Sequence, residues 1–136
     1  LEVTEKLAQN IFISSGSHSQ YAALAAFDQE NLTELEQRKN IFAERRDFLY
    51  DNLIRLGFKI PIKPQGAFYI YADCSNFTDD SFHFAKALLE TEALAVTPGK
   101  DFGHNDPQRF IRFAYTASID KITIAMQRLE KYINQG

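Results

Sequence analysis

The sequence predicts an α+β fold in which a small mixed or antiparallel sheet is covered by helices. Helical apolar spacing occupies residues 1–56 and returns at the end of the chain, whereas short β-favouring runs separated by turns lie between. Hydrophobic residues make up 45% of the 136 residues, which is enough to bury one domain core. We divide the chain into a helical segment, residues 1–30, and a small C-terminal domain, residues 31–136.

The first segment is expected to form two helices. Val3, Leu7 and Ile11 recur at four-residue spacing, with polar residues between them. No capping signal precedes this pattern, so we expect the chain to belong to a longer protein, with these three side chains poorly covered or buried by another copy. Ser17 is a candidate N-cap for the Ala-rich residues 18–27, which favour a second helix.

A long amphipathic helix of roughly 25 residues is predicted next. Its start has two candidate capping boxes, Asn31 with Glu34 and Thr33 with Glu36. Gly57 is expected to end it, as glycine commonly does at the position after a helix. The apolar stripe recurs every seven residues, at Leu35, Phe42, Leu49 and Leu56.

Beyond Gly57 the pattern becomes strand-like. Asp79 or Asp80 is a candidate cap for a helix that precedes the third strand, and Ser118 or Asp120 is a candidate start for the last helix. The short strands are predicted at residues 58–62, 67–72, 94–97 and 110–115.

Composition excludes several functional classes. Lys and Arg total 15 against 18 for Asp and Glu, a net charge of −3, which excludes a generally basic nucleic-acid binder. The apolar runs are too short for a membrane span. His18, His83 and His104 have no metal-ligand spacing, so no metal site is expected. Cys74, the single cysteine, fits a reducing, cytoplasmic compartment and a buried thiol better than a nucleophile.

Arg112 is the residue that stands out for chemistry. It carries a permanent charge inside the apolar run 110–114, where strand alternation places it on one face with Phe110 and Ala114. A cation that is not fully solvated needs an anionic partner, and the guanidinium fork suits a carboxylate. From the pattern alone, Arg112 is an exposed strand residue, the partner of a structural Asp or Glu, or a binder of a carboxylate ligand.

Four motifs together resemble the C-terminal part of the class I/II pyridoxal-phosphate-dependent aminotransferases, in the aspartate aminotransferase-like branch. They occur in the family's order and extend over essentially the whole chain. The motifs are Ser14-Ser15-Gly16-Ser17-His18-Ser19-Gln20, Pro64-Gln65-Gly66-Ala67-Phe68-Tyr69, Val96-Thr97-Pro98-Gly99 with Phe102-Gly103, and Arg112-Phe113-Ala114-Tyr115-Thr116.

This resemblance implies a two-domain enzyme that exchanges an amino group between an amino acid and a 2-oxo acid. The present residues would form its small domain and adjoining helices. Arg112 matches the arginine that binds the substrate α-carboxylate, and Gly66 and Phe68 would lie on the substrate side of the cleft. The family's active sites lie at a dimer interface, so the resemblance also implies a homodimer.

The resemblance is incomplete because the Schiff-base lysine has no match. The chain has eight lysines, and none has the family's serine-containing context followed by glycine and arginine. Pyridoxal 5′-phosphate is therefore expected in the parent protein and not on this chain, no residue of which we assign to the cofactor. The chain alone is expected to be inactive.

Two alternatives from other functional classes remain. The first is a free-standing α+β ligand-binding or regulatory module in which Arg112 binds the carboxylate of an effector. The second is a structural or dimerisation domain in which Arg112 forms a buried ion pair. A large α/β domain that carries a lysine and precedes residue 1 would distinguish the aminotransferase from both.

Overall fold

The structure of the protein is a computed structural model that describes residues 1–135. It contains two compact units, Leu1–Asn40 and Ile41–Gly136, here called the N-terminal and C-terminal units. The division falls within the longest helix, α3 (Gln29–Leu56).

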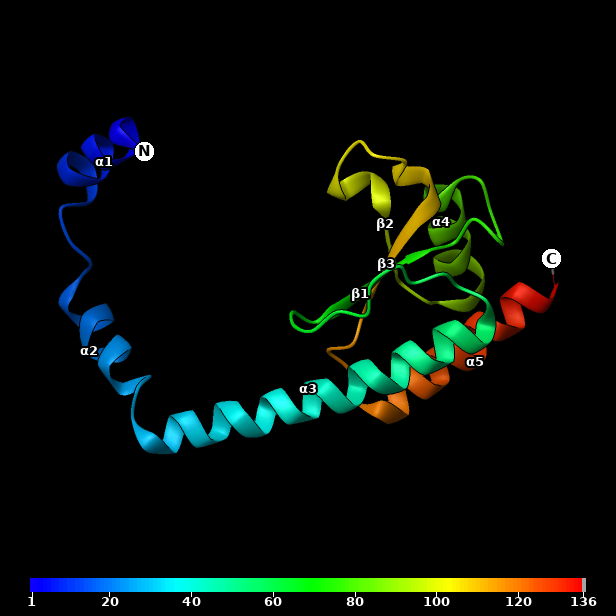
Figure 1. Ribbon diagram of the computed structural model, residues 1–136, viewed down its shortest axis with the longest axis horizontal. Helices are drawn as coiled ribbons and strands as arrows, with labels where there is room; N and C mark the ends of the chain where they lie inside the picture. The colour runs from blue at the N-terminus through cyan, green and yellow to red at the C-terminus, as the bar shows by residue number, and fades with distance from the viewer. Residues whose placement is uncertain (136) are drawn as a thin grey trace. The chain divides into compact units, whose positions relative to one another are not determined.

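All the regular secondary structure of the N-terminal unit is helical (Figure 1). Its elements are α1 (Glu2–Leu7), the π-helix η1 (Ala8–Phe12), α2 (Ser17–Ala25) and the first turns of α3. Every residue in it is exposed. Val3, Leu7 and Ile11 have relative exposures of 74%, 54% and 71%, which confirms the expectation that they are poorly covered.

The predictions of capping residues in this unit were wrong. Gly16, not Ser17, precedes α2, and no side chain caps that helix. Asn31 and Thr33 lie inside α3, which begins at Gln29, and their side chains donate to backbone carbonyl oxygens. A capping side chain must instead stand before the helix and accept from its free N–H groups.

The C-terminal unit confirms the predicted α+β class (Figure 1). Its sheet has the strand order β1-β3-β2, with both pairs antiparallel. The strands are β1 (Tyr69–Asp73), β2 (Thr97–Pro98) and β3 (Phe110–Ala114). The end of α3 accompanies α4 (Ser81–Glu92), α5 (Ile119–Gln135) and the short 3₁₀ turns η2 (Gly99–Phe102) and η3 (Pro107–Arg109).

Two helix boundaries follow the predicted chemistry. Gly57 ends α3 with a φ of +99°, a left-handed conformation that glycine adopts without strain. Of the two candidate caps for α4, Asp80 is the one used. Its carboxylate accepts from the backbone N–H groups of Phe82 and His83 at 2.9 and 3.1 Å.

Two predicted strands were too long. In residues 58–62 only Lys59 pairs, through an isolated antiparallel bridge with Asp73. Pro61 has no N–H to donate to a longer ladder. In residues 94–97 only Thr97 joins the sheet, where it is followed by Pro98.

The core lies on the face of the sheet opposite Arg112. Ile111, Phe113 and Tyr115 alternate with exposed or partly buried neighbours and are themselves buried, as strand periodicity predicts. Helices cover this face, and an ion pair between Arg55 and Glu130 joins α3 to α5. The helical side chains that are buried in this hydrophobic core are Leu49, Leu53, Phe84, Leu88, Ile122, Met126 and Leu129.

Tyr115 connects this core to the loop that precedes β1. Its hydroxyl donates to the carbonyl oxygens of Gly66 and Ala67, at 3.0 and 3.2 Å. Its backbone N–H donates to the carbonyl oxygen of Phe68 at 2.8 Å. Ala67 has a φ of +61°, which is unfavourable for a residue with a side chain. These three contacts, here called the Tyr115 strap, therefore hold the loop in a conformation that it does not favour alone.

A buried carboxylate joins the end of β1 to the start of β3. Asp73 is 4% exposed and accepts from the Arg109 guanidinium at 2.5 Å and from the Ser75 backbone N–H at 2.8 Å. Burial of Asp73 favours its neutral form, but the hydrogen bonds from Ser75 and Arg109 outweigh this effect. The pKa of Asp73 therefore lies below its ordinary value.

The substitution Tyr115→Phe removes the hydroxyl and leaves two loop carbonyls without that donor. We expect the free energy of unfolding in urea to fall by about 1–2 kcal/mol. Amide hydrogen exchange in residues 66–68 should accelerate. The matched control is Tyr21→Phe, at a side chain that is 75% exposed, which should leave stability unchanged. Equal effects of the two substitutions would contradict the strap.

The substitution Asp73→Asn tests the carboxylate by its pH dependence. A carboxyl group whose pKa is lowered in the folded state stabilises the fold above the pKa of its unfolded state, near 3.8, and this stabilisation is lost as the pH falls through the folded pKa. Wild-type stability should therefore decline more steeply below about pH 4 than that of Asp73→Asn. Asp51→Asn, at an exposed position on α3, should retain the wild-type slope.

Candidate functional site

Arg112 occupies the middle of β3, on the face away from the core. It is paired with Tyr71 of β1 on one side and Thr97 of β2 on the other. The side chain is partly buried, and its Nη2 donates to the Thr97 hydroxyl oxygen at 3.2 Å. Its Nε is buried and has no hydrogen-bond partner among residues 1–135. The exposed-strand alternative for Arg112 therefore does not describe this side chain.

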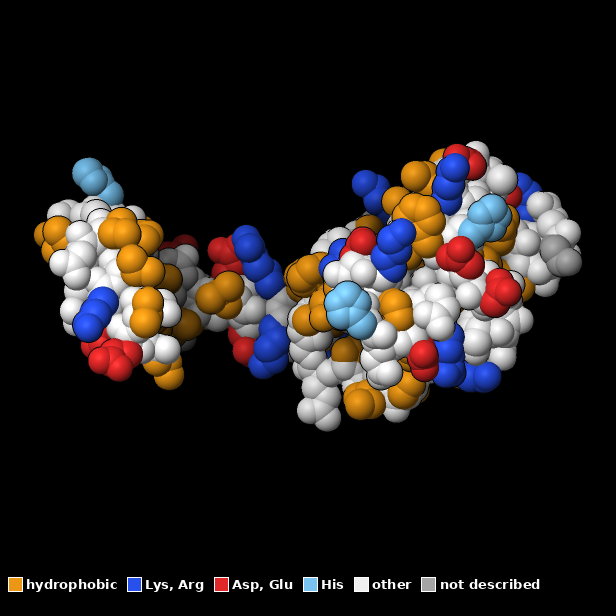
Figure 2. Space-filling view, turned by 90° about the horizontal axis from the view of Figure 1, so that it is seen from above, with side chains coloured by type: hydrophobic (Ala, Val, Ile, Leu, Met, Phe, Trp, Pro, Cys, Tyr) orange, Lys and Arg blue, Asp and Glu red, His pale blue; other side chains and the backbone are white. Residues whose placement is uncertain are grey.

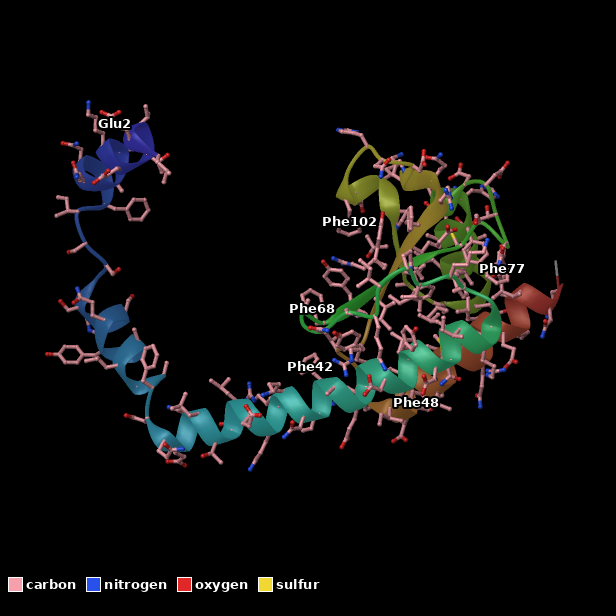
Figure 3. The ribbon with its side chains drawn as sticks, viewed as in Figure 1. Glu2, Phe42, Phe48, Phe68, Phe77 and Phe102 are labelled. Carbon is pink, nitrogen blue, oxygen red and sulfur yellow. The ribbon has the colours of Figure 1, made fainter. Side chains whose placement is uncertain are left out.

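Three aromatic rings surround the guanidinium of Arg112. Its Cζ atom lies 4.8 Å from the ring centroid of Phe102, 5.4 Å from that of Tyr69 and 5.9 Å from that of Phe68. These distances are within the range of cation–π attraction. Figure 3 shows Phe68 and Phe102 at the same edge of the C-terminal unit, on segments that are far apart in the sequence. We call Arg112 and these three rings the arginine cage.

The cage contains no carboxylate. Among residues 1–135, Arg112 forms no ion pair, so the structural ion pair considered from the sequence is absent from this part of the chain. The buried carboxylate of the sheet, Asp73, is already bound to Arg109. Four other arginines have a carboxylate partner, in the pairs Arg38–Glu34, Arg46–Asp47, Arg55–Glu130 and Arg109–Asp73.

The three residues expected at the site are placed differently. Arg112 and Phe68 lie together in the cage. Gly66 is connected to it only indirectly, because its carbonyl oxygen accepts from Tyr115, and a Cβ atom at Gly66 would meet nothing within 4 Å. Its position does not require glycine on steric grounds.

Sequence reasoning missed three members of this environment as site residues. Thr97, Tyr69 and Phe102 were quoted within motifs but were given no role. The register of β2 against β3 brings Thr97 to Arg112, and η2 brings Phe102 over it. Tyr69 could have been found from alternation, because it lies on the same face of β1 as Tyr71, opposite Arg112.

Aromatic contacts extend from the cage to Tyr71 and Phe110. Tyr71 stacks on Phe110 with ring centroids 4.8 Å apart and contacts Phe102 edge-on at 6.0 Å. Burial raises the pKa of Tyr71, so its hydroxyl stays neutral. Arg112 is therefore the charged member of the cage, and the other members are aromatic rings. Such a setting strengthens the attraction between a guanidinium and a carboxylate.

These residues fit the carboxylate end of a ligand and do not fit the contacts that pyridoxal phosphate requires. That cofactor needs a lysine for its Schiff base, and the arginine cage includes no lysine. Lys100 lies over the ring of Phe82, and four other lysines form ion pairs. Those pairs are Lys39–Glu36, Lys63–Asp47, Lys86–Glu90 and Lys131–Glu92.

Other candidate chemistry is not supported in residues 1–135. Cys74 is fully buried, and burial raises its pKa to about 11, so the thiolate is disfavoured. No group of three His, Cys, Asp or Glu side chains in this part of the chain could hold a metal ion. None of the helices in the same range combines the length and the apolar character that a membrane span requires.

The N-terminal unit has a different surface. Figure 2 shows hydrophobic side chains distributed over its helices. They have few neighbours to cover them, and the most exposed include Ile13 at 82%, Phe12 at 77% and Phe27 at 76%. Large exposed apolar areas of this kind mark surfaces that bind other protein.

Comparison with known proteins identifies the family. The family model described as aminotransferase class I and II matches residues 3–129. The chain is 33% identical over 135 residues to the (5-formylfuran-3-yl)methyl phosphate transaminase of Methanocaldococcus jannaschii, covering 99% of this chain and 35% of the relative. It is 30% identical over 141 residues to an aspartate aminotransferase of Bacillus subtilis, with the same coverage of 99% and 35%.

Solved structures agree with these sequence relatives. An aminotransferase from Mycobacterium tuberculosis superimposes with a TM-score of 0.87 at 34% identity, covering 96% of this chain and 34% of that one. The chain thus spans about a third of the length of the curated relatives that it matches. With the family model matching most of its length and the fold shared, the chain belongs to the class I and II aminotransferase family.

Proposed function

We propose that this chain is the small-domain part of a pyridoxal-phosphate-dependent aminotransferase and that Arg112 binds the α-carboxylate of its amino acid and 2-oxo acid substrates. The observation that carries the proposal is the arginine cage, in which a partly buried guanidinium has aromatic neighbours and no carboxylate partner among residues 1–135. A substrate carboxylate would provide the anion that this environment favours.

The contribution of the cage is orientation. Two parallel hydrogen bonds between a guanidinium and a carboxylate fix the carboxylate in position and in plane. Arg112 would thereby set the direction of the bonds at the substrate Cα. Phe68 would cover one side of the carboxylate, and the strap from Tyr115 would hold the loop that carries Phe68.

The cofactor would be bound mainly by residues outside this chain. Pyridoxal 5′-phosphate supplies the electron sink in transamination, and the family relationship supports its presence in the parent protein. The Schiff-base lysine and the phosphate-binding groups would come from the remaining two-thirds or so that the relatives possess and this chain does not span.

We further propose that the parent is a homodimer of the aspartate aminotransferase-like branch. Aspartate aminotransferases of several bacteria are among the relatives, which supports the branch. The exposed hydrophobic side chains of the N-terminal unit support burial against the rest of the parent or against a second subunit.

We also propose a cytoplasmic location for the parent, which the single, buried thiol of Cys74 supports.

The substitution Arg112→Ala in the intact enzyme tests the proposed role of the cage. Loss of two charged hydrogen bonds should lower kcat/KM for amino acid substrates by about 10²- to 10⁴-fold. The matched control is Arg128→Ala, because Arg128 donates to the carbonyl oxygen of Glu92 on the helical side of the unit. Steady-state kinetics provides the measurement. A kcat/KM for Arg112→Ala within threefold of wild type would reject the role of Arg112 in binding the α-carboxylate.

The chain alone should neither retain the cofactor nor transaminate, because the groups that bind the cofactor are proposed to lie elsewhere. Incubation of the 136-residue chain with pyridoxal phosphate followed by dialysis should leave no cofactor absorbance band. The intact enzyme, treated in parallel, should keep its band. A stoichiometric cofactor band on the dialysed chain would refute the proposal that the cofactor-binding groups lie outside it.

A further inference from the structure

Thr97 is the cross-strand neighbour that forms a side-chain hydrogen bond with Arg112. It lies directly opposite Arg112 across the β2–β3 pair, and its hydroxyl oxygen accepts from Arg112 Nη2 at 3.2 Å. Cross-strand partners of this kind lie on the same face of the sheet with their Cβ atoms close together. The strand register therefore suffices to bring the Thr97 hydroxyl within hydrogen-bond distance of the guanidinium.

The aromatic rings of the cage cannot provide the same direction. Cation–π attraction holds a charge over a ring face but depends weakly on rotation of the guanidinium within its own plane. The Nε–H group of Arg112 is buried and has no acceptor among residues 1–135. Within that part of the chain, the side chain of Arg112 donates its hydrogen bond to the Thr97 hydroxyl.

The backbone that carries Thr97 is tightly fixed. Gly99, two residues further on, is buried where β2 enters η2. A Cβ atom added to Gly99 would lie 2.3 Å from the carbonyl oxygen of Pro107 and 2.7 Å from the hydroxyl of Tyr71. Because three segments meet at this contact, β2 has little freedom to shift relative to β3. The packing consequently holds the backbone that carries Thr97.

The neutral character of Thr97 matters as much as its position. An Asp or Glu opposite Arg112 would form a permanent ion pair and compete with any ligand carboxylate. A hydroxyl oxygen accepts one hydrogen bond and leaves the positive charge of the guanidinium intact. The Thr97 hydroxyl therefore binds the guanidinium without neutralising it.

We propose that Thr97 is a positioning residue that fixes the orientation of the Arg112 guanidinium for binding of the substrate α-carboxylate. The inference rests on the proposed function and adds a second residue to it. Thr97 acts through Arg112, so its influence should depend on the presence of both the arginine and a carboxyl group on the ligand.

The test uses Thr97→Val and Thr97→Ser in the intact enzyme. Valine keeps the shape and β-branching of threonine without the hydroxyl, whereas serine keeps the hydroxyl. For the amino acid that the wild type converts fastest among L-aspartate, L-alanine and L-phenylalanine, Thr97→Val should raise KM about tenfold with kcat little changed. Thr97→Ser should restore KM to within about threefold of wild type. Thr123→Val, which removes a hydroxyl from α5, is the matched control.

A second readout separates positioning from general damage to the fold. The half-reaction is measured under single-turnover conditions with the same amino acid and with the amine that lacks its α-carboxyl group: β-alanine, ethylamine or 2-phenylethylamine. Thr97→Val should weaken the reaction with the amino acid and leave the slower reaction with the amine at the wild-type rate. In an Arg112→Ala background, Thr97→Val should have no further effect, because the pair acts as one unit.

The outcomes distinguish a failure of the proposed function from a failure of the role of Thr97. If the wild type converts no amino acid, the proposed function fails and this inference fails with it. Suppose instead that the wild type is active and that Arg112→Ala lowers kcat/KM. If Thr97→Val then matches wild type, or slows the reactions with the amino acid and with the amine equally, only the role of Thr97 is overturned. An effect that is confined to the amino acid and lost in the Arg112→Ala background supports it.

Discussion

The antiparallel pairing of β3 between β1 and β2 is the constraint on which the candidate site depends. Burial of Ile111 and Phe113 against the helices fixes which face of β3 is apolar. Since side chains alternate along a strand, Arg112 must then lie on the opposite face. The register with the two neighbouring strands places Tyr71 on one side of Arg112 and Thr97 on the other. Hydrophobic burial on one face thus positions a charge on the other.

The way in which the charge of Arg112 is accommodated separates this site from the ion pairs of the same unit. Arg109 meets a buried carboxylate and ties two strands together. Arg112 meets ring faces and one hydroxyl, none of which carries a negative charge. In the first arrangement, the carboxylate of Asp73 neutralises the positive charge of Arg109 within the fold. The second leaves it able to attract an anion, which is the property that carboxylate recognition requires.

The parts of the fold that depend on local chemistry could be predicted from the sequence. The stop at Gly57, the cap at Asp80 and the alternation around Arg112 all follow from rules that involve a few neighbouring residues. The failures have a common cause. The lengths of the strands predicted at 58–62 and 94–97 depend on which residues find a partner across the sheet, and a β-favouring run does not encode that partner.

The candidate site shows the same division between local and long-range information. The sequence identified Arg112 because its charge interrupts an apolar strand, and the family resemblance added Phe68. Thr97 and Phe102 reach Arg112 only through strand register and the path of η2, so a linear pattern gives them no role. The resemblance also placed Gly66 on the substrate side of the cleft, and that role stays a prediction. In the structure the carbonyl oxygen of Gly66 accepts from the Tyr115 hydroxyl, a contact that only the folded loop reveals.

The short strand β2 also affects how the sheet ends. β2 lies at an edge, where unpaired N–H groups normally invite a strand from another molecule and can seed fibrils. Pro98 has no N–H to offer, and the strand stops after two residues. At the other edge, β1 is partly capped by its bridge to Lys59. The sheet that presents the arginine cage is thereby poorly suited to templating aggregation.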